Sequence, residues 1–184
     1  MPEPREFPRL SIEDRLTDEQ REKIRAIDTL SIEAYPRAMS VLISLEMKPA
    51  TEIDIGPHHD PPDTVRRVLE AAGLKVAERP PDPEREWVRF IVAKDGAALK
   101  EMEGLSATKD HHRYGELMGF TPSMMDAFEH KIDRLSDRVR AQEPVARIFH
   151  AILSREHAHD EMEVLRRWEA AVRTYAPTTY RELL

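Results

Sequence analysis

The chain contains no cysteine. This absence excludes disulfide bonds, thiolate catalysis, iron–sulfur clusters and zinc sites built on cysteine. A metal would therefore need His, Asp or Glu ligands, and a nucleophile would need a hydroxyl, an amine or a carboxylate. No apolar run approaches the roughly 18 residues of a transmembrane helix, so we expect no membrane-spanning segment. The first residues, MPEPREFPRL, include no apolar signal core, and we expect a cytoplasmic protein.

Positive charge is also in deficit, because the formal net charge is −7 over 184 residues. Such a chain repels a phosphate backbone at long range, so a nucleic-acid partner is the least favoured interpretation. Hydrophobic residues make up 40% and charged residues 34%, which is typical of a soluble globular protein. The sequence has no phosphate-binding glycine loop, no Gly-x-Ser-x-Gly, no His-Glu-x-x-His and no dinucleotide fingerprint.

The first half of the chain alternates helix and strand signals. We expect a flexible arm over residues 1–16 and then an α/β domain with N-terminal helices over residues 17–105. A capping box at Thr17–Gln20 predicts a helix to about Thr29, and the run VLISL fits either a helix or a buried strand. The order strand–helix–strand–strand–helix then resembles a small ferredoxin-like α/β sandwich. Its predicted elements are strands at 53–55, 74–77 and 86–93, helices at 60–73 and from Asp95, and a turn at 79–85.

The second half, residues 106–184, carries no strand signal and predicts an α-helical elbow followed by a long helical hairpin. One helix would begin at Thr121–Pro122 and the other at Glu143–Pro144, ending near Tyr175. The first shows an apolar stripe, which would cover either the protein's own core or a second copy of the chain. The fold class is therefore α+β, and we expect a homo-oligomer. The stripe consists of Met125, Phe128, Ile132, Leu135 and Val139.

Two of the three histidine clusters have competing interpretations. In GPHHDPP, His58, His59 and Asp60 lie between a strand end and a helix start, where they could hold a metal or an anion, with Asp54 nearby. The alternative is a surface turn in which Asp60 caps the helix. In REHAHDE, Glu156 and His159 have the spacing of a carboxylate–histidine metal pair, but a salt-bridged surface turn explains them equally. The polar stretch 154–161 should either leave the core or line a cavity.

The third cluster, DHHRYGELMGFTP, predicts an elbow between two helices. Asp110 would cap a short helix, Gly119 would end it in the left-handed conformation, and Thr121 would cap the next. This account leaves the two histidines unexplained. We therefore take the elbow as the candidate ligand-binding segment, and we add its histidines to the candidate metal ligands. The ligand-binding set is His111, His112, Tyr114, Gly119 and Phe120, and the metal set is His58, His59, Asp60, His111 and His112.

The stretch YGELMGFTPSMMDAF follows a strand reading VRFIVAKD. Over about residues 86–130 it resembles a group of small archaeal proteins with a Gly-x-Leu-Leu-Gly-Tyr-Pro-x-Cys-Cys-x-x-Ala-Phe segment. Thr121 stands where that segment has proline, and Ser123 and Met124 stand where it has cysteines. The resemblance implies the elbow and no particular activity, and any thiol chemistry of the group is absent here. The matching residues are Gly115, Leu117, Gly119, Phe120, Ala127 and Phe128.

Two functions remain open. The first is a binding module for a small molecule or a protein partner, without an evident catalytic centre. The second is a metal-dependent enzyme in which zinc or iron, held by clustered histidines and carboxylates, activates a water molecule. The enzyme requires the loops around residues 58 and 111 to meet. A separation of more than about one Debye length, ~10 Å, would exclude a shared site.

Overall fold

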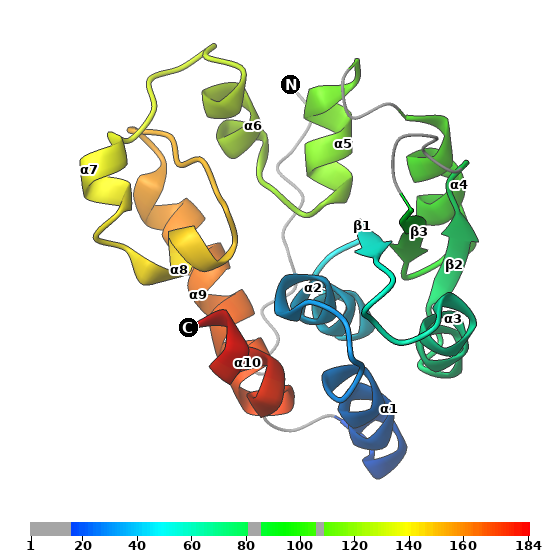
Figure 1. The fold of residues 1–184 in the computed structure, drawn as a ribbon. Helices are drawn as coiled ribbons and strands as arrows, with labels where there is room; N and C mark the ends of the chain where they lie inside the picture. Colours follow the sequence, from blue (N-terminus) through cyan, green and yellow to red (C-terminus); the bar gives the residue numbers. More distant parts are fainter. Residues whose placement is uncertain (1–15, 81–85, 106–108) are drawn as a thin grey trace.

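The computed structural model describes residues 16–80, 86–105 and 109–184 (Figure 1). Residues 1–15 of the expected arm and 81–85 of the expected turn lie outside the described residues. No helix in the described ranges is long and apolar enough to cross a membrane. The α+β class is confirmed, because these ranges form ten helices and a three-stranded antiparallel sheet. The strands are β1 (Ala50–Ile55), β2 (Lys75–Glu78) and β3 (Val88–Ala93).

The sheet has the order β1-β3-β2, so β3 lies in the middle and pairs with both neighbours. Ile53 of β1 and Glu78 of β2 both lie opposite Phe90. Successive side chains of a strand point to opposite faces. Phe90 and Val92 therefore enter the large core cluster, whereas Ile91 and Ala93 enter a smaller cluster on the other face. Both faces of this short sheet are covered.

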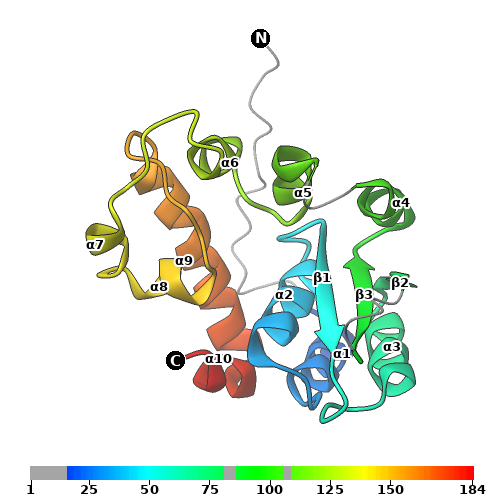
Figure 2. The same ribbon diagram turned by 45° about the horizontal axis from the view of Figure 1, so that its top comes forward.

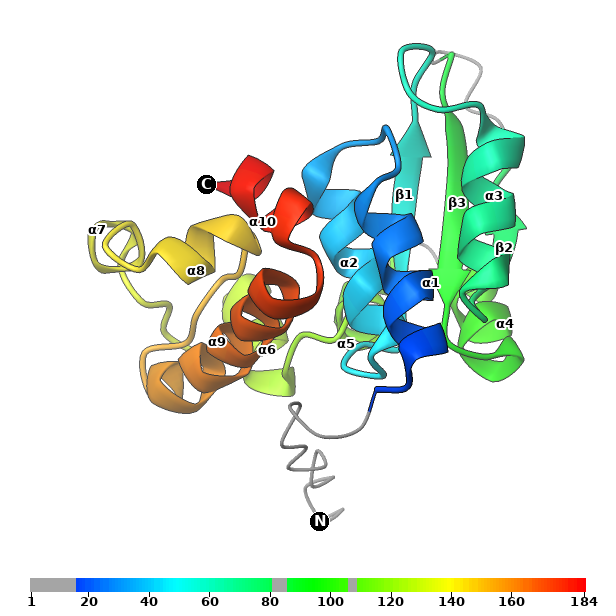
Figure 3. The ribbon, with the colours of Figure 1, turned by 90° about the horizontal axis from the view of Figure 1, so that it is seen from below.

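Three helices cover the first face (Figure 3). The capping box is confirmed, since the Thr17 hydroxyl accepts from the amide of Gln20, and the Gln20 side chain accepts from the amide of Thr17. The ambiguous run VLISL is helical, and it is buried between the sheet and the C-terminal helices. The covering helices are α1 (Asp18–Asp28), α2 (Ala34–Ser44) and α3 (Pro62–Ala71).

The second face is covered by α4 (Gly96–Gly104) and α5 (His111–Leu117). Asp95 caps α4 as predicted, because its carboxylate accepts from the amide of Ala98 at 2.8 Å. In a ferredoxin-like sandwich both crossover helices would lie on one face of the sheet. Here Leu69 of α3 packs with Phe90, whereas Met102 of α4 packs with Ile91. The two helices thus lie on opposite faces, and the ferredoxin-like arrangement is not confirmed.

The long helical hairpin predicted for the second half is wrong in its first arm. The helix α6 (Pro122–Phe128) stops after seven residues, and His130 adopts a left-handed φ of 60°. The guanidinium of Arg134 donates to the carbonyl oxygens of Ala127 and Phe128 at 2.8 and 2.7 Å. A side chain from beyond the helix therefore satisfies the free carbonyls of its last turn. Of the predicted stripe, Phe128 is 45% exposed and Val139 is 44% exposed.

The second arm is broken as well. The helix that starts at Pro144 ends at Ile148, and His150 follows with a left-handed φ of 52°. The chain then runs extended, and Leu135 donates its amide to the carbonyl of Leu153 at 2.8 Å. Two extended segments therefore pair where two long helices were expected. The helices of this region are α7 (Asp137–Arg140), α8 (Pro144–Ile148), α9 (Ala158–Tyr175) and α10 (Pro177–Leu183).

The last two helices form a C-terminal pair that packs on α2. The carboxylate of Asp28, the last residue of α1, accepts from the amides of Thr178 and Thr179 at 3.2 and 2.7 Å. It therefore caps α10 from 150 residues away in sequence. Residues from both predicted domains, such as Leu42 and Leu165, enter the same buried cluster. Figure 3 shows α2 lying between the sheet and this helical pair.

Candidate functional site

A cavity of about 340 Å³ lies between α5, α6 and the segment that follows α8. We name it the α5–α6 pocket. Its volume is at the lower end of the range for small-molecule sites, and its lining is dominated by methionine and aromatic side chains. The lining residues are His111, Tyr114, Gly115, Met118, Phe120, Met124, Met125, Phe128, His150 and Ile152.

The elbow positions the two helical walls of the pocket. Gly119 ends α5 with a left-handed φ of 85°, and the Thr121 hydroxyl accepts from the amide of Met124 to cap α6, both as predicted. Asp110 occupies the N-cap of α5, although its side chain accepts no capping hydrogen bond there. A Cβ on Gly115 would lie only 2.0 Å from the sulfur of Met125. A larger residue at position 115 would therefore require the Met125 side chain to move.

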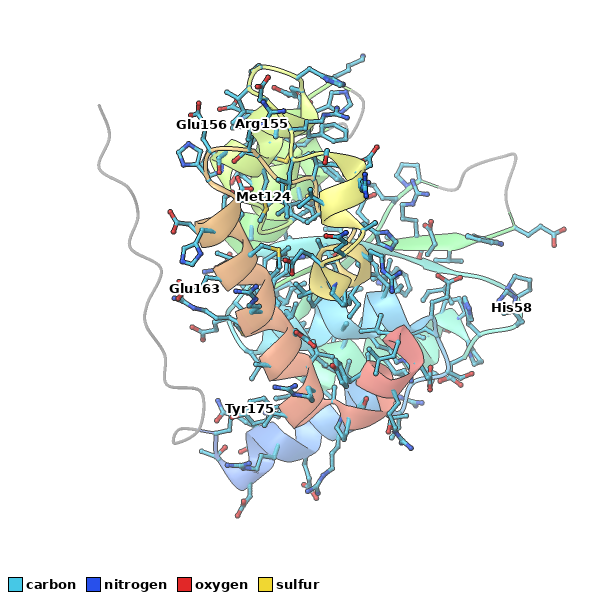
Figure 4. All side chains as sticks on the ribbon, turned by 90° about the vertical axis from the view of Figure 1, so that its left-hand side faces the viewer. His58, Met124, Arg155, Glu156, Glu163 and Tyr175 are labelled. Carbon is cyan, nitrogen blue, oxygen red and sulfur yellow. The ribbon has the colours of Figure 1, made fainter. Side chains whose placement is uncertain are left out.

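The pocket has an apolar floor. Met124 and Met125 are only 2% and 6% exposed, and Met118 and Phe120 are half-buried. Figure 4 shows Met124 enclosed by the surrounding elements, with His58 far away on another part of the surface. Methionine is flexible and polarisable, so it adapts to apolar ligands of varied shape. The floor can accept an apolar group by hydrophobic burial.

Two exposed imidazoles lie at the rim. The His111 ring is 5.8 Å from the ring of Phe128, and the His150 ring is 5.1 Å, edge-on, from the ring of Tyr35. Burial raises the pKa of Tyr35 to about 12, so this partner of His150 is neutral. An imidazole ring offers two nitrogens for hydrogen bonds to a ligand. The rim can therefore bind a polar group while the floor binds an apolar one.

Tyr114 joins the pocket to the charged second face of the sheet. Its hydroxyl hydrogen-bonds the carboxylate of Glu52, which also pairs with Arg79 at 2.8 Å. Burial and the neighbouring Glu52 charge raise the pKa of Tyr114. The guanidinium of Arg79 in turn donates to the carbonyl of Met102 at 2.8 Å, which fixes the end of α4. Tyr114 is thus a neutral, well-anchored wall residue.

A buried carboxylate holds the third wall in place. Glu161, at 1% exposure, accepts from the amide of Ser154 at 2.7 Å and from the hydroxyl of Ser123 at 2.5 Å. The Ser154 hydroxyl accepts from the amide of His157. Glu161 therefore joins α9, α6 and the segment carrying His150. The polar stretch 154–161 had left two options open, leaving the core or lining a cavity. Most of it leaves the core, because residues 155–157, 159 and 160 are exposed, whereas its two ends, Ser154 and Glu161, are buried and tie the elements behind the pocket wall together.

A buried lysine lies behind the aromatic wall, and the sequence analysis did not identify it. Lys48 is 1% exposed, and its ammonium nitrogen lies 4.3 Å from the ring centre of Trp168 and 5.3 Å from that of Phe120. It also lies 2.9 Å from the sulfur of Met39. Burial lowers the pKa of Lys48 to about 7. Gly119 has no Cβ, and this leaves room for the lysine side chain. A Cβ at position 119 would lie only 3.0 Å from the Cε atom of Lys48.

The structure places the predicted ligand-binding residues unevenly. His111, Tyr114 and Phe120 line the α5–α6 pocket. His112 points elsewhere, with its ring nitrogens 3.6 Å from Glu116 and 3.4 Å from Asp126. Gly119 contributes the turn and the space beside Lys48. The elbow prediction therefore located a pocket wall, whereas the methionine floor and His150 were not in the predicted set.

The predicted metal ligands do not converge. His59 accepts from the amide of Gly56 at 2.8 Å, and Asp60 accepts from the amide of Ser31 at 2.7 Å, so Asp60 ties two loops and does not cap α3. Figures 2 and 3 show α5 near the start of β1 and the β1–α3 turn beyond its end. A strand of this length spans roughly 20 Å. Within residues 16–80, 86–105 and 109–184, no three His, Asp or Glu side chains are grouped to hold a metal.

The residues of the REHAHDE cluster are also dispersed. Glu156 precedes α9, whereas His159 lies exposed in its first turn. Glu163 pairs with Arg167 on the outer surface of α9. Figure 4 shows Glu156 and Glu163 at the periphery of the molecule. These contacts agree with the salt-bridged surface interpretation.

No protein-family model matches the chain, and no curated protein or solved structure matches it either. The resemblance to the archaeal group therefore stays a prediction. The residues of the α5–α6 pocket are therefore the basis for inferring a function.

Proposed function

We propose that the protein is a binding module for a small molecule with an apolar body and one polar group. The observation that carries this proposal is the pairing of a buried methionine floor with two exposed imidazoles around one 340 Å³ cavity. The apolar body would lie against Met124 and Met125. The polar group would hydrogen-bond both His111 and His150 at the rim.

The energetics favour a small molecule of this kind. Burying apolar surface yields about 25 cal/mol per Å², so a modest hydrocarbon contributes several kcal/mol before the costs of binding. The walls are rigidly held by the Gly119 turn, the Thr121 cap and the buried Glu161 carboxylate. A preformed pocket loses little conformational entropy when it binds. Binding therefore requires no rearrangement of the fold.

Backbone geometry at the end of α8 places His150 at the rim. His150 has a φ of 52°, a conformation that costs a non-glycine residue on the order of 1 kcal/mol. The same conformation follows α2 at Glu46 and α6 at His130, so it is the turn that ends a helix, with the amide of Ala151 donating to the carbonyl of Ala146. The conformation places the imidazole on the pocket lining.

Tryptophan fluorescence provides a direct test. The chain has two tryptophans, and Trp168 lies 6.0 Å from Phe120, between ring centres. In a Trp87→Phe protein, Trp168 is the sole tryptophan and reports on the pocket wall. Titration with 4-phenyl-1-butanol should produce a saturable change in its emission. The same molecule with only the tail, butylbenzene, should bind more weakly because it cannot use the histidines.

Matched variants identify the site. His111→Ala and His150→Gly should each weaken binding of the alcohol by about tenfold, the value of one hydrogen bond. His159→Ala, an exposed histidine on α9, should leave binding unchanged. An emission change that does not saturate, or that is the same in all three variants, would contradict the proposal.

A further inference from the structure

The ammonium group of Lys48 occupies a position that the stability of the fold does not require. It is buried among Met39, Phe120 and Trp168, and among the described residues it has no carboxylate within ion-pair distance. Burying an unpaired charge is unfavourable, and an apolar side chain would fill this space without that cost. Phe120 contacts the lysine and also lines the α5–α6 pocket, so its ring separates the amine from that cavity.

We infer that Lys48 is a reactive amine that forms an imine with an aldehyde carried by the molecule bound in the α5–α6 pocket. This inference rests on the proposed binding function and specifies its ligand class. The apolar tail would occupy the methionine floor in both states, and the aldehyde would leave the histidine rim and reach the lysine nitrogen past the edge of Phe120. Phe120 is half-buried, and its backbone is held between the Gly119 turn and the Thr121 cap, so imine formation requires only that its ring turn aside.

The chemistry is balanced without any further reactant. The lone pair of the neutral amine attacks the carbonyl carbon to give a carbinolamine, and loss of one water molecule leaves the carbon–nitrogen double bond. The reaction requires the unprotonated amine. Burial supplies it, since it lowers the pKa of Lys48 to about 7. An exposed lysine, with a pKa near 10.4, holds about a thousandfold less neutral amine at pH 7.

The test traps the imine in the intact protein. Hexanal and sodium cyanoborohydride at pH 7 convert the imine into a stable secondary amine, which peptide mass mapping assigns to one lysine. We expect Lys48 to react about tenfold faster or more than Lys100, which is exposed on α4. In an unfolded chain the two lysines are equivalent, so a preference for Lys48 requires the folded protein. Lys48→Arg should abolish the preferred adduct.

Two further measurements test the route. Phe120→Ala should accelerate labelling of Lys48, because it removes the ring between the cavity and the amine. Hexanol, which has the tail but no carbonyl, should slow labelling of Lys48 and leave that of Lys100 unchanged. Equal labelling of Lys48 and Lys100 would overturn the inference. Labelling of Lys48 that hexanol does not slow would overturn it as well, because the amine would then be reached by another path.

The proposed function and the imine can fail separately. If 4-phenyl-1-butanol binds to the pocket but Lys48 is not labelled preferentially, the imine is wrong and the binding function stands. If 4-phenyl-1-butanol does not bind, the binding function is wrong and the imine with it.

Discussion

The ammonium nitrogen of Lys48 lies 4.3 Å from the centre of the Trp168 ring, and the lysine is 99% buried by the surrounding side chains, with 1% of its surface exposed. The indole face partly compensates a positive charge at this distance. It does not restore the hydration that the ammonium loses, which is why burial lowers the pKa of Lys48 to about 7. Burial of Lys48 therefore makes the free energy of unfolding dependent on pH.

The direction in which the free energy of unfolding changes with pH follows from the lowered pKa of Lys48. Lys48 has a folded pKa of about 7, below its unfolded value of 10.5, so between these values the unfolded chain holds more protons. The free energy of unfolding should therefore rise with pH across this window. The contribution is on the order of 3–5 kcal/mol between pH 6 and 10.

Replacing the amine isolates this contribution. Lys48→Met should raise the free energy of unfolding at pH 7 by about 1–3 kcal/mol, because an apolar side chain fills the same space. Its advantage over wild type should shrink as the pH rises towards 10. Urea unfolding at several pH values measures both effects, with Lys100→Met as the exposed control. A variant less stable than wild type at pH 6 would contradict the burial of an unpaired amine.

Asp28 should be essential for docking of the C-terminal helix. Asp28→Ala removes the acceptor for the amides of Thr178 and Thr179, and should lower the free energy of unfolding by about 1–2 kcal/mol. In the Asp28→Ala variant, amide hydrogen exchange should accelerate relative to wild type in α10 more than in β3. Glu22→Ala, an exposed change on the same helix, is the control. Unchanged exchange at Thr178 and Thr179 would show that the cap is not formed.

Glu161 should stabilise the fold and the pocket together. Glu161→Gln keeps the size of the side chain but removes the charge that accepts from Ser123 and Ser154. We expect a loss of about 1.5–3 kcal/mol in unfolding free energy, and weaker binding of 4-phenyl-1-butanol. Glu163→Gln, at an exposed residue of α9 whose carboxylate pairs with Arg167, should cost about 0.3–0.5 kcal/mol. Equal effects of the two variants would refute the role assigned to Glu161.

His150 and His130 form a matched pair, because both adopt left-handed backbone conformations and only His150 lines the pocket. Glycine relieves backbone strain at either position, although it also makes the unfolded chain more flexible. We therefore expect both glycine variants to unfold within about 1 kcal/mol of wild type. Only His150→Gly should weaken binding of the alcohol. Loss of binding in His130→Gly would indicate an indirect effect of the backbone.

Local signals in the sequence predicted much of the first half of the fold and the elbow. The capping residues Thr17, Asp95 and Thr121 and the left-handed Gly119 act through neighbours three or four residues away, so their patterns are readable. The prediction of a long hairpin was wrong because its helices are interrupted by contacts between residues further apart in the sequence. Arg134 satisfies the last carbonyls of α6, and the segments around residues 135 and 153 pair with each other. Periodic apolar spacing does not reveal such contacts.

The candidate site was only partly predictable. The elbow pointed to His111, Tyr114 and Phe120 because two histidines in a glycine-punctuated turn lacked a structural explanation. His150 lies some forty residues further along, and Lys48 comes from a segment near β1 that shows no unusual motif. The positions of His150 and Lys48 at or behind the pocket wall depend on how α2, α5 and α9 pack. Burial of a charged residue without a partner is a property of the tertiary structure, and composition does not encode it.

The methionine methyl groups provide the most direct test of the proposed pocket. The chain has eight methionines, of which Met118, Met124 and Met125 line the pocket, whereas Met39 and Met102 do not. In protein labelled with carbon-13 at the methionine methyls, 4-phenyl-1-butanol should shift the three pocket resonances with one common saturation curve. The resonance of Met102, buried under the second face of the sheet, should stay in place. Absence of a saturable shift at Met124 and Met125 would contradict the binding function.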